Sequence, residues 1–579
     1  MTRQSKISNQ QSIIQSRDRD LLLLAAIASA VSLLSFLHYF QRGEILLYGD
    51  AVAHINIARR VFDSQTPGLL QLGTVWLPLP HLLLLPFLIS DWMWQSGLGG
   101  SIPSMMAYVL GVVGIFRLTR GVLEADLGTR PAARRGAWLA ALVYGANPNL
   151  IYLQATAMTE ALYLVFFIWA VVYFGEWMRN PIPTEGTGEH GRKPTSPWKA
   201  IWCLAGAELT RYDGWFLAAV CGAVVLWMLT RQWSERGFRR AAMKFLVGIV
   251  AAPVLWLGYN AAVYGNPLEF ANGPYSAKAI EQKTAQPGYA GHPGAGNAFT
   301  AGSFFLKSAQ LNMAEGNWGR IWIAVALAGL VLTVVRLRTR GVFLLLWVPL
   351  VFYALSIAYG GVPLFLPAWW PFTWYNLRYG LQFLPVFAVS LALMASALAD
   401  IAAPEGAVKE KRSAPSLKRW PDTNLQKLAI AAMVGLVVLS YSFVWKAGPL
   451  CFKEAWVNSR TKLALESSVA QRIVRLPRDA RYLMYLGDHV GAFQQAGVPL
   501  RQVIHEGNHR QWKRPSDPEG LWERALADPA KYVDFVIVFE GDAVDRAVNR
   551  NGLTLISAIH TTGQPHASIY TTRLVPANP

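Results

Sequence analysis

Hydrophobic residues are gathered into long, nearly uncharged runs separated by short polar segments. The first run, residues 21–40, carries no charge over about 20 positions, enough for an α-helix to cross a hydrocarbon core of roughly 30 Å. Further runs follow at residues 102–119, 136–152, 160–177, 198–210, 214–231, 244–262, 319–336, 341–359, 379–398 and 428–446. The pattern predicts a polytopic α-helical membrane protein with about eleven spans.

Composition supports this class. Of the 579 residues, 53% are hydrophobic and only 15% are charged, whereas about 25% of a soluble domain is charged. A cleaved signal peptide is the alternative for the first run, but its apolar core would measure only about 7–15 residues. We therefore expect an uncleaved first span.

The charges of the loops predict the topology. Basic residues gather in alternate loops, at residues 117–135, 179–193, 231–244, 336–340 and 409–419. The intervening loop 263–318 balances three lysines against three glutamates, and 360–377 has no charge. Because basic loops face the cytoplasm, the N-terminus is expected inside and the C-terminus outside. The net charge of +18 then reflects cytoplasmic loops rather than nucleic-acid binding.

Two segments depart from the pattern of simple spans. Residues 77–95 are apolar but contain Pro78, Pro80 and Pro86, and a span there would invert every later loop. We expect this stretch to lie at, or dip into, the outer face beside a cavity, because irregular backbone needs protein or water around it. After residue 446, β-rich runs at residues 481–487, 498–507, 532–541 and 566–575 alternate with polar helical stretches. The predicted domains are a membrane domain, 1–446, and an extracytoplasmic α/β domain, 447–579.

Several ionisable residues lie at the predicted outer ends of the spans. Asp50 follows the first span, and His54 shares its face at i+4 if a helix begins there. Asp50 is alternatively a helix cap, and the pair alone provides too few ligands for a metal. Glu160 opens an apolar span, either as an acid favoured by the helix dipole or as a functional group.

Two arginines complete this outer set. Glu208, Arg211 and Asp213 lie between two apolar runs, and an i, i+3 pair of Glu208 with Arg211 is the favoured interpretation. Arg378, beside Tyr375 and Tyr379, either snorkels from a helix end or binds a phosphate through its planar guanidinium. We favour phosphate binding. The outer carboxylates and arginines together predict a site for an anionic, amphipathic substrate that enters from the lipid.

Four motifs extend this prediction. PGLLQLGTVWLPLPH follows Asp50, and MTEALYL, ELTRYDGW and NLRYGLQFLP appear in order along the chain. In this order and outer location they resemble the GT-C superfamily of polyprenyl-phosphate-sugar glycosyltransferases, in particular family-39-like bacterial members. The resemblance covers residues 1–446, and the trailing α/β domain fits it too. Asp50 is followed by Ala51, where mannosyltransferase-type members carry an Asp-Glu pair.

The resemblance implies transfer of a sugar from a polyprenyl-phosphate donor to the hydroxyl of an extracytoplasmic acceptor, with inversion at the sugar, at the bacterial inner membrane. It makes Asp50 the catalytic base and Glu160 a second acid that orients the acceptor or a metal; a divalent metal stays open. Arg378 and then Arg211 are the expected phosphate ligands. The remaining expected substrate-binding residues are His54, Asp213, Tyr375 and Tyr379.

Two other functions remain as alternatives. A multi-pass transporter or flippase of a lipid-linked or anionic substrate would also have many spans and buried charges. Transporters often have inverted repeats with interrupted spans near the midplane, whereas here the polar residues gather at one face. A scaffold that binds a partner through its C-terminal domain leaves the outer carboxylates unexplained.

Overall fold

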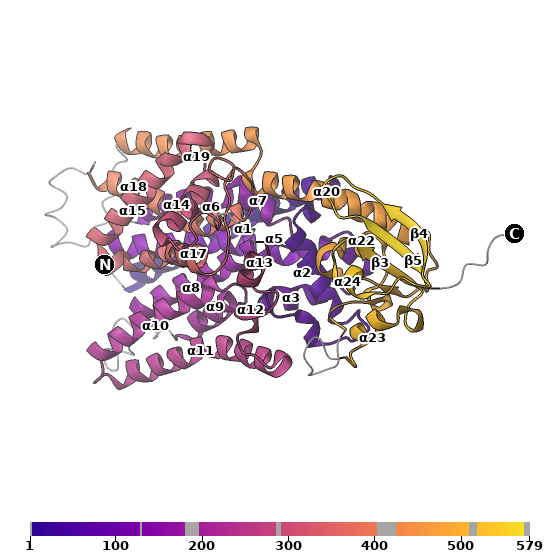
Figure 1. Cartoon of the computed structure of the whole chain (residues 1–579). Coiled ribbons are helices and arrows are strands. Elements are labelled where there is room, and N and C mark those ends of the chain that lie inside the picture. The colour runs from indigo at the N-terminus through magenta and orange to yellow at the C-terminus, as the bar shows by residue number, and fades with distance from the viewer. Residues whose placement is uncertain are drawn as a thin grey trace.

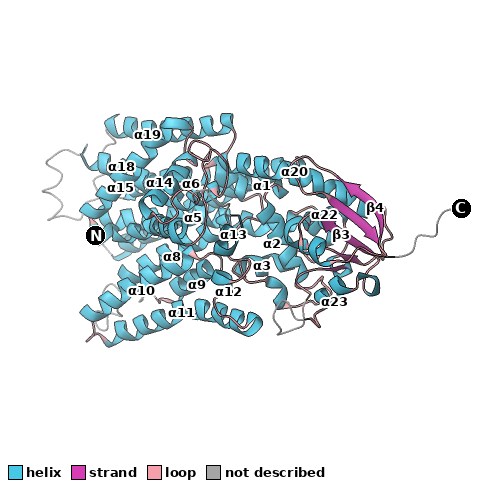
Figure 2. Cartoon of the chain, viewed as in Figure 1, coloured by secondary structure: helices cyan, strands magenta, loops and turns pink. Residues whose placement is uncertain are grey.

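The computed structural model describes residues 3–127, 130–179, 196–284, 291–401, 424–508 and 518–572. Residues 180–193 of one basic loop and the whole of the basic loop 409–419 lie outside these residues. Figure 1 shows a helical body that carries the N-terminus at one end and a small sheet at the other. Figure 2 shows that the strands gather at the C-terminal end.

Nine helical segments of the described chain are long and apolar enough to cross a membrane. They contain α1 (Arg3–Gln41), α5 (Leu98–Leu127), α8 (Glu160–Arg179), α10 (Asp213–Arg231), α11 (Arg236–Tyr264), α15 (Gly319–Val335), α17 (Val348–Tyr359), α18 (Leu384–Ile401) and α19 (Asn424–Ala447). The prediction of a multi-pass helical membrane protein is confirmed.

Two of the eleven predicted spans form shorter helices. Residues 136–152 divide into α6 (Arg130–Gly145) and α7 (Pro148–Leu153), because the Asn147 side chain accepts hydrogen bonds from the first amides of α7 and starts a new helix. Residues 198–210 form α9 (Trp198–Glu208). At about 1.5 Å per residue, α9 covers little more than half of the hydrocarbon core. The count of eleven crossings stays a prediction.

The long helices pack around α5. This helix contacts α1, α6 and α8, and α18 packs between α6 and α15. Small residues permit the close approaches, since any Cβ at Gly329 of α15 would collide with Ser390 of α18. The tight packing leaves the polar ends of the helices to build the site.

The segment 77–95 is not one helix. Its prolines divide it into α3 (Leu79–Leu84), a 3₁₀ turn η3 (Leu85–Phe87) and α4 (Asp91–Gln95), each far too short to span. Together with α2 (Gly49–Arg60) and η2 (Leu69–Leu72), these pieces lie between the membrane helices and the C-terminal sheet. The segment therefore does not cross the membrane as one helix, as predicted, and its place at the outer face beside a cavity stays a prediction.

Short elements connect the remaining helices. They are η1 (Glu44–Leu46), α12 (Glu269–Asn272), α13 (Ala277–Thr284), α14 (Ala298–Leu311), η4 (Gly316–Trp318), α16 (Leu337–Arg340), η5 (Gly341–Trp347) and η6 (Leu377–Phe383). Asn376 has a positive φ of 59°, which turns the chain into η6. This turn sets the direction of the next two residues, Leu377 and Arg378.

The C-terminal region is α/β, as predicted. The long helix α20 (Leu450–Ile473) leads into a five-stranded sheet of order β2-β1-β3-β5-β4. Its strands are β1 (Tyr482–Leu483), β2 (Val503–Ile504), β3 (Phe535–Phe539), β4 (Thr554–Ile559) and β5 (Ala567–Thr571). Strands β2, β1 and β3 run parallel, whereas β5 is antiparallel to both β3 and β4.

Six short helices of the described residues accompany this sheet, and one strand was not predicted. The helices are α21 (Leu486–His489), α22 (Gly491–Ala496), η9 (Leu500–Gln502), α23 (Leu521–Ala527), η10 (Pro529–Lys531) and, beyond β3, α24 (Ala543–Ala547). The missed strand, β4, lies at the edge of the sheet and is mostly exposed, so it lacks the apolar run that marks β3. The predicted strand at 566–575 extends beyond the described residues at 573–575.

Buried amides fasten the C-terminal region to the first outer loop. Asn56 of α2 donates to Gln494 Oε1 of α22 at 2.7 Å and accepts from the Trp94 indole at 3.0 Å. Gln494 in turn donates to the Trp94 carbonyl at 2.8 Å, which closes the triangle. All three residues are buried. The helix that carries Asp50 is thus held by the C-terminal region.

Replacing Gln494 by Ala is expected to lower the free energy of unfolding by about 1–3 kcal/mol, because the buried Asn56 amide loses its acceptor and the Trp94 carbonyl its donor. The thermal unfolding temperature in detergent measures the loss. Gln495→Ala is the matched control, since the neighbouring Gln495 is exposed. Equal unfolding temperatures for the two variants would contradict the fastening role.

Candidate functional site

Three carboxylates meet on one guanidinium. Arg378 of η6 donates from Nη2 to Asp50 Oδ2 at 2.5 Å, from Nε to Glu160 Oε1 at 3.2 Å and from Nη1 to Glu454 Oε1 at 3.2 Å. These acids come from the first turn of α2, the start of α8 and the first turns of α20. The structure therefore brings together Asp50, Glu160 and Arg378, and adds a carboxylate that the sequence analysis did not single out.

The three acids differ in their access to solvent. The side chains of Glu160 and Glu454 are 0% and 1% exposed, and that of Arg378 is 8% exposed, whereas Asp50 is 39% exposed. A buried carboxylate needs a paired charge, because desolvation alone costs several kcal/mol. Asp50 is the open member of the group. Among the described residues its only hydrogen-bonding side-chain partner is Arg378, through one of its two oxygens.

Arg211 extends the network from the turn between α9 and α10. Its Nη1 donates to Glu160 Oε1 at 3.2 Å, and its Nε lies 3.5 Å from Asp213 Oδ1. Its Nη2 donates to the Tyr353 hydroxyl at 2.9 Å, and that hydroxyl donates to Asp213 Oδ2 at 3.2 Å. Glu160 is therefore shared by both arginines, and Asp213 and Arg211 belong to the same site.

The predicted pairing of Glu208 with Arg211 is wrong. Arg211 turns away from α9 towards Glu160 and Asp213, and Glu208 Oε2 is buried without a hydrogen-bond partner. The physical reason is the tight reversal at Gly214, whose Cα lies so close to the backbone of Ala207 that a Cβ would collide with it. In a continuous helix Glu208 and Arg211, three residues apart, would lie on the same face, but the turn directs them to different sides.

Aromatic rings cover the guanidinium groups. The Tyr379 ring centroid lies 4.9 Å from the Arg211 guanidinium carbon and 5.2 Å from that of Arg378. The Tyr48 ring centroid also lies 5.2 Å from the Arg378 guanidinium carbon. Such cation–π contacts stabilise the charged guanidinium groups and fix the orientation of their planes. Tyr48 also donates to the Cys451 carbonyl at 2.8 Å, which ties α20 to the entrance of α2.

Tyr375 lies at the rim of this site. Its side chain is 46% exposed. Burial of its hydroxyl end, together with the nearby Tyr379 and Asp50, raises its pKa to about 12. Tyr375 is consequently a neutral hydroxyl at physiological pH, suited to hydrogen bonding rather than to acid–base work.

His54 contacts a second histidine, and its predicted role in substrate binding stays a prediction. It shares α2 with Asp50, but its Nδ1 lies 2.9 Å from His81 Nε2 of α3, and its ring packs 4.7 Å from that of Trp76. Both histidines are buried. Burial lowers the pKa of His54 to about 3, with Arg378 and Arg211 contributing, and burial also lowers the pKa of His81. The histidine pair is neutral and joins α2 to α3.

This pair predicts a loss of stability in acid. In the unfolded chain a histidine has a pKa of about 6.5, so below this pH the unfolded state binds protons that folded His54 refuses. Stability is fully present above about pH 6.5 and falls as the pH drops towards 3, by on the order of 2 kcal/mol for His54 at pH 5. Unfolding temperatures measured from pH 8 to pH 5 should show this fall.

The His54→Asn variant should show a smaller fall than the wild type, since its amide does not titrate. His566→Asn is the control, because the His566 side chain is 57% exposed. A full wild-type fall in His54→Asn would remove His54 as its source.

The described residues do not fit a metal centre. No group of three or more His, Cys, Asp or Glu side chains among them is arranged to hold a metal ion. Asp50, Glu160 and Glu454 all face the Arg378 guanidinium, so a cation already stands between them. His54 is engaged with His81 rather than with Asp50. No step is assigned to a metal.

Three residues of the site were missed by sequence reasoning. Glu454 lies beyond the last predicted span, within the region assigned to the C-terminal domain. Its signal is helical periodicity, since Leu450, Cys451, Glu454 and Ala455 form one buried face of α20. Tyr353 lies within an apolar run and Tyr48 directly before the Asp50 helix, and no pattern distinguishes either from an ordinary membrane tyrosine.

Comparison with known proteins gives structural matches alone. No protein-family model and no curated protein matches the chain. The structure of ArnT from Cupriavidus metallidurans bound to undecaprenyl phosphate is similar, with a TM-score of 0.52 and 14% identity over 96% of this chain and 99% of that chain. The apo ArnT structure gives 0.48 and 14%, over 96% and 98% of the two chains.

A third structure is similar at lower score. The oligosaccharyltransferase of Archaeoglobus fulgidus in the apo form has a TM-score of 0.46 and 13% identity, over 90% of this chain and 69% of that one. The ArnT structure bound to undecaprenyl phosphate matches 96% of this chain and so covers both the membrane helices and the C-terminal sheet. ArnT has the GT-C fold. The predicted resemblance is confirmed at the level of fold, and this multi-pass membrane protein has the GT-C fold.

Proposed function

We propose that the chain is a glycosyltransferase that moves a sugar from a polyprenyl-phosphate donor to the hydroxyl of an extracytoplasmic acceptor. The observation that carries this proposal is the half-open Asp50 carboxylate at the edge of an otherwise buried network of acids and arginines. The binding of undecaprenyl phosphate by ArnT, which has the same fold, supports a lipid-phosphate donor.

Asp50 is the proposed general base. As the acceptor oxygen forms a bond to the anomeric carbon, its proton passes to the carboxylate, a contribution of about 10²- to 10⁴-fold to the rate. The bond from the anomeric carbon to the phosphate oxygen breaks, and its electron pair leaves with polyprenyl phosphate. This single displacement inverts the configuration at the sugar. The exposed oxygen of Asp50 is free to face the acceptor.

Arg378 is the proposed phosphate ligand, with Arg211 beside it. All three nitrogens of Arg378 face carboxylates, and the Asp50 side is the one that opens to solvent. The donor phosphate would enter there and take the Nη2 hydrogen bond from Asp50. Donor binding thereby releases the base towards the acceptor. Glu160 holds both arginines in position for the departing charge.

The site is proposed to face the periplasm, with the N-terminus in the cytoplasm. Asp20 lies at the start of the apolar span of α1, residues Arg19–Gln41, and Asp126 lies at the end of α5, both remote from the site. There they pair with basic residues, Arg134 and Arg340, each at 2.6 Å. Basic residues concentrated at that end fit a cytoplasmic face. The proposed membrane is the bacterial inner membrane.

Reconstitution separates transfer from transport. Proteoliposomes receive radiolabelled undecaprenyl-phosphate sugars together with a cell-envelope extract as the source of acceptor. A transferase moves the label from the lipid into the acceptor fraction and releases undecaprenyl phosphate. Movement of the intact labelled lipid across the bilayer, with no consumption, would replace the proposal by the transporter alternative.

A further inference from the structure

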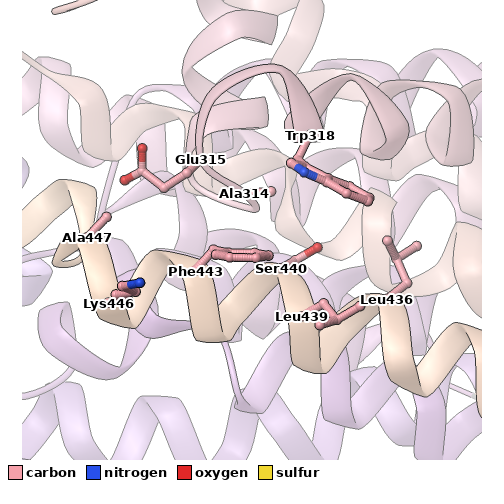
Figure 3. Close-up of a pocket in the computed structure, with 9 residues that line it drawn as sticks. All are labelled: Ala314, Glu315, Trp318, Leu436, Leu439, Ser440, Phe443, Lys446 and Ala447. Atoms are coloured by element: carbon pink, nitrogen blue, oxygen red, sulfur yellow. The ribbon is translucent and has the colours of Figure 1, made fainter.

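A hollow lies outside the carboxylate network of Arg378, against helix α19 at the edge of the helical body. It has a volume of about 400 Å³, within the ordinary range of ligand sites. Figure 3 shows it between α19 and the turn that precedes α15. Its lining residues are Ala314, Glu315, Trp318, Leu436, Leu439, Ser440, Phe443, Lys446 and Ala447. Neither the proposed transfer reaction nor the structural matches assign it a role.

The walls of this hollow are apolar and face the bilayer. Leu436, Leu439 and Phe443 lie along one side of α19, and Trp318 lies across from them. The side chains of Leu439, Phe443 and Trp318 are 54%, 47% and 55% exposed. In Figure 1, α19 lies at the edge of the helical body, where it packs on α18. The hollow is therefore open sideways, to the hydrocarbon of the membrane.

The mouth of the hollow is cationic. Lys446 is exposed and forms no hydrogen bond or ion pair with any described residue. Glu315, the acid of the lining, pairs with Lys453 of α20 at 3.4 Å, so its charge is already matched. Arg320, at the start of α15, is also exposed. Lys446 and Arg320 lie at the predicted outer ends of their helices, where the distribution of loop charges places few basic residues.

The dimensions of the hollow match one leaflet. From Leu436 to Lys446 the lining rises by ten residue steps along α19, about 15 Å at 1.5 Å per residue. One leaflet provides half of a hydrocarbon core of roughly 30 Å. A single acyl chain whose headgroup lies at Lys446 therefore runs the length of the apolar wall. A polyprenyl chain of many isoprene units is too long to be enclosed by it.

We propose that this hollow binds one acyl chain of an anionic phospholipid, whose phosphate contacts Lys446. The proposal does not rest on the proposed transfer reaction. Its position nevertheless connects it with the site, since Ala314 follows directly on the segment that contains Asn312. The Asn312 amide donates to the Leu377 carbonyl at 2.9 Å, next to Arg378. A bound lipid thus stabilises the turn that supports Arg378.

Photocrosslinking in nanodiscs tests the proposal. The probes are phosphatidylglycerol and phosphatidylcholine that carry the same photoactivatable acyl chain, each at low mole fraction in the same lipid mixture. Mass spectrometry then quantifies the label in peptides that contain residues 314–318 and 436–447. We expect phosphatidylglycerol to label these peptides several-fold more than phosphatidylcholine does. Equal labelling by the two lipids would overturn the anionic assignment.

Two variants identify the charge responsible. Lys446→Gln should reduce phosphatidylglycerol labelling to the phosphatidylcholine level. Lys427→Gln, an exposed lysine at the other end of α19, should leave the difference intact. A preference that survives in Lys446→Gln contradicts the proposed contact. A photoactivatable polyprenyl phosphate that labels these peptides more than phosphatidylglycerol would overturn the phospholipid assignment in favour of the donor chain.

Discussion

Asp50→Asn is expected to reduce sugar transfer by about 10²- to 10⁴-fold while the protein stays folded. The amide keeps the size of the side chain and can still accept a hydrogen bond from Arg378, but it cannot take the proton of the acceptor. Because Asp50 is 39% exposed, its loss leaves no buried charge unpaired. Arg378 retains Glu160 and Glu454. The initial rate of label transfer in proteoliposomes measures the effect.

The matched control for Asp50→Asn is Asp91→Asn. Asp91 also belongs to the first outer loop and pairs with an arginine, Arg59, at 2.5 Å, but it lies outside the carboxylate network. We expect near wild-type transfer from this variant. The unfolding temperature of Asp50→Asn should stay close to that of the wild type. Full transfer activity in Asp50→Asn would remove Asp50 as the base.

The membrane fold follows from sequence periodicity because lipid imposes a simple rule. Each span must satisfy its backbone hydrogen bonds internally, so long apolar runs become helices. Residues 136–152 and 198–210 are apolar as well, yet local polar chemistry decides their length. Asn147 starts a new helix within the first of them, and α9 ends at Glu208. Such breaks depend on hydrogen bonds that hydropathy does not measure.

The composition of the site was partly predictable for a related reason. Once the loop charges assign a set of helix ends to one face of the membrane, the ionisable residues at those ends are expected to lie close together. Asp50, Glu160, Arg211, Asp213 and Arg378 were selected in this way, and the structure joins them in one network. Their pairings were not predictable. The Glu208–Arg211 spacing indicated a local pair, but the turn at Gly214 directed Arg211 elsewhere.

Glu454 shows the limit of dividing the chain at residue 446. Helix α19 ends at Ala447 and α20 begins at Leu450, so the sequence indicates a change of domain there. In the structure α20 contacts η6 as well as α22, and its first turns bring Glu454 to Arg378. The C-terminal region therefore contributes a charge to the site and holds α2 through Gln494. We infer that it takes part in positioning the site.

Arg378→Ala is expected to cost about 3–5 kcal/mol of stability, because it removes the partner of two buried acids. Glu160 keeps Arg211 at 3.2 Å, whereas Glu454 keeps only neutral donors among the described residues, the Tyr48 hydroxyl at 3.3 Å and the Asn376 backbone amide. Most of the loss should therefore come from Glu454. Thermal unfolding in detergent measures it, and an unchanged unfolding temperature would contradict the pairing. A weaker dependence of transfer on the polyprenyl-phosphate sugar in Arg378→Ala alone would not distinguish misfolding from the loss of phosphate binding.

The double variant Arg378→Ala/Glu454→Gln separates these two effects. The neutral amide introduced by Glu454→Gln needs no guanidinium partner, so we expect the double variant to recover much of the stability that Arg378→Ala loses. Comparison with the two single variants gives the interaction energy between Arg378 and Glu454. Glu454→Gln alone should stay folded and active, since Arg378 keeps Asp50 and Glu160. The concentration of polyprenyl-phosphate sugar that half-saturates the double variant should still be at least about tenfold raised, as expected for the loss of one charged hydrogen bond. A stable double variant with wild-type donor dependence would show that Arg378 only neutralises buried acids. It would then leave Arg211 as the phosphate ligand, because that guanidinium also contacts Glu160 and is 15% exposed.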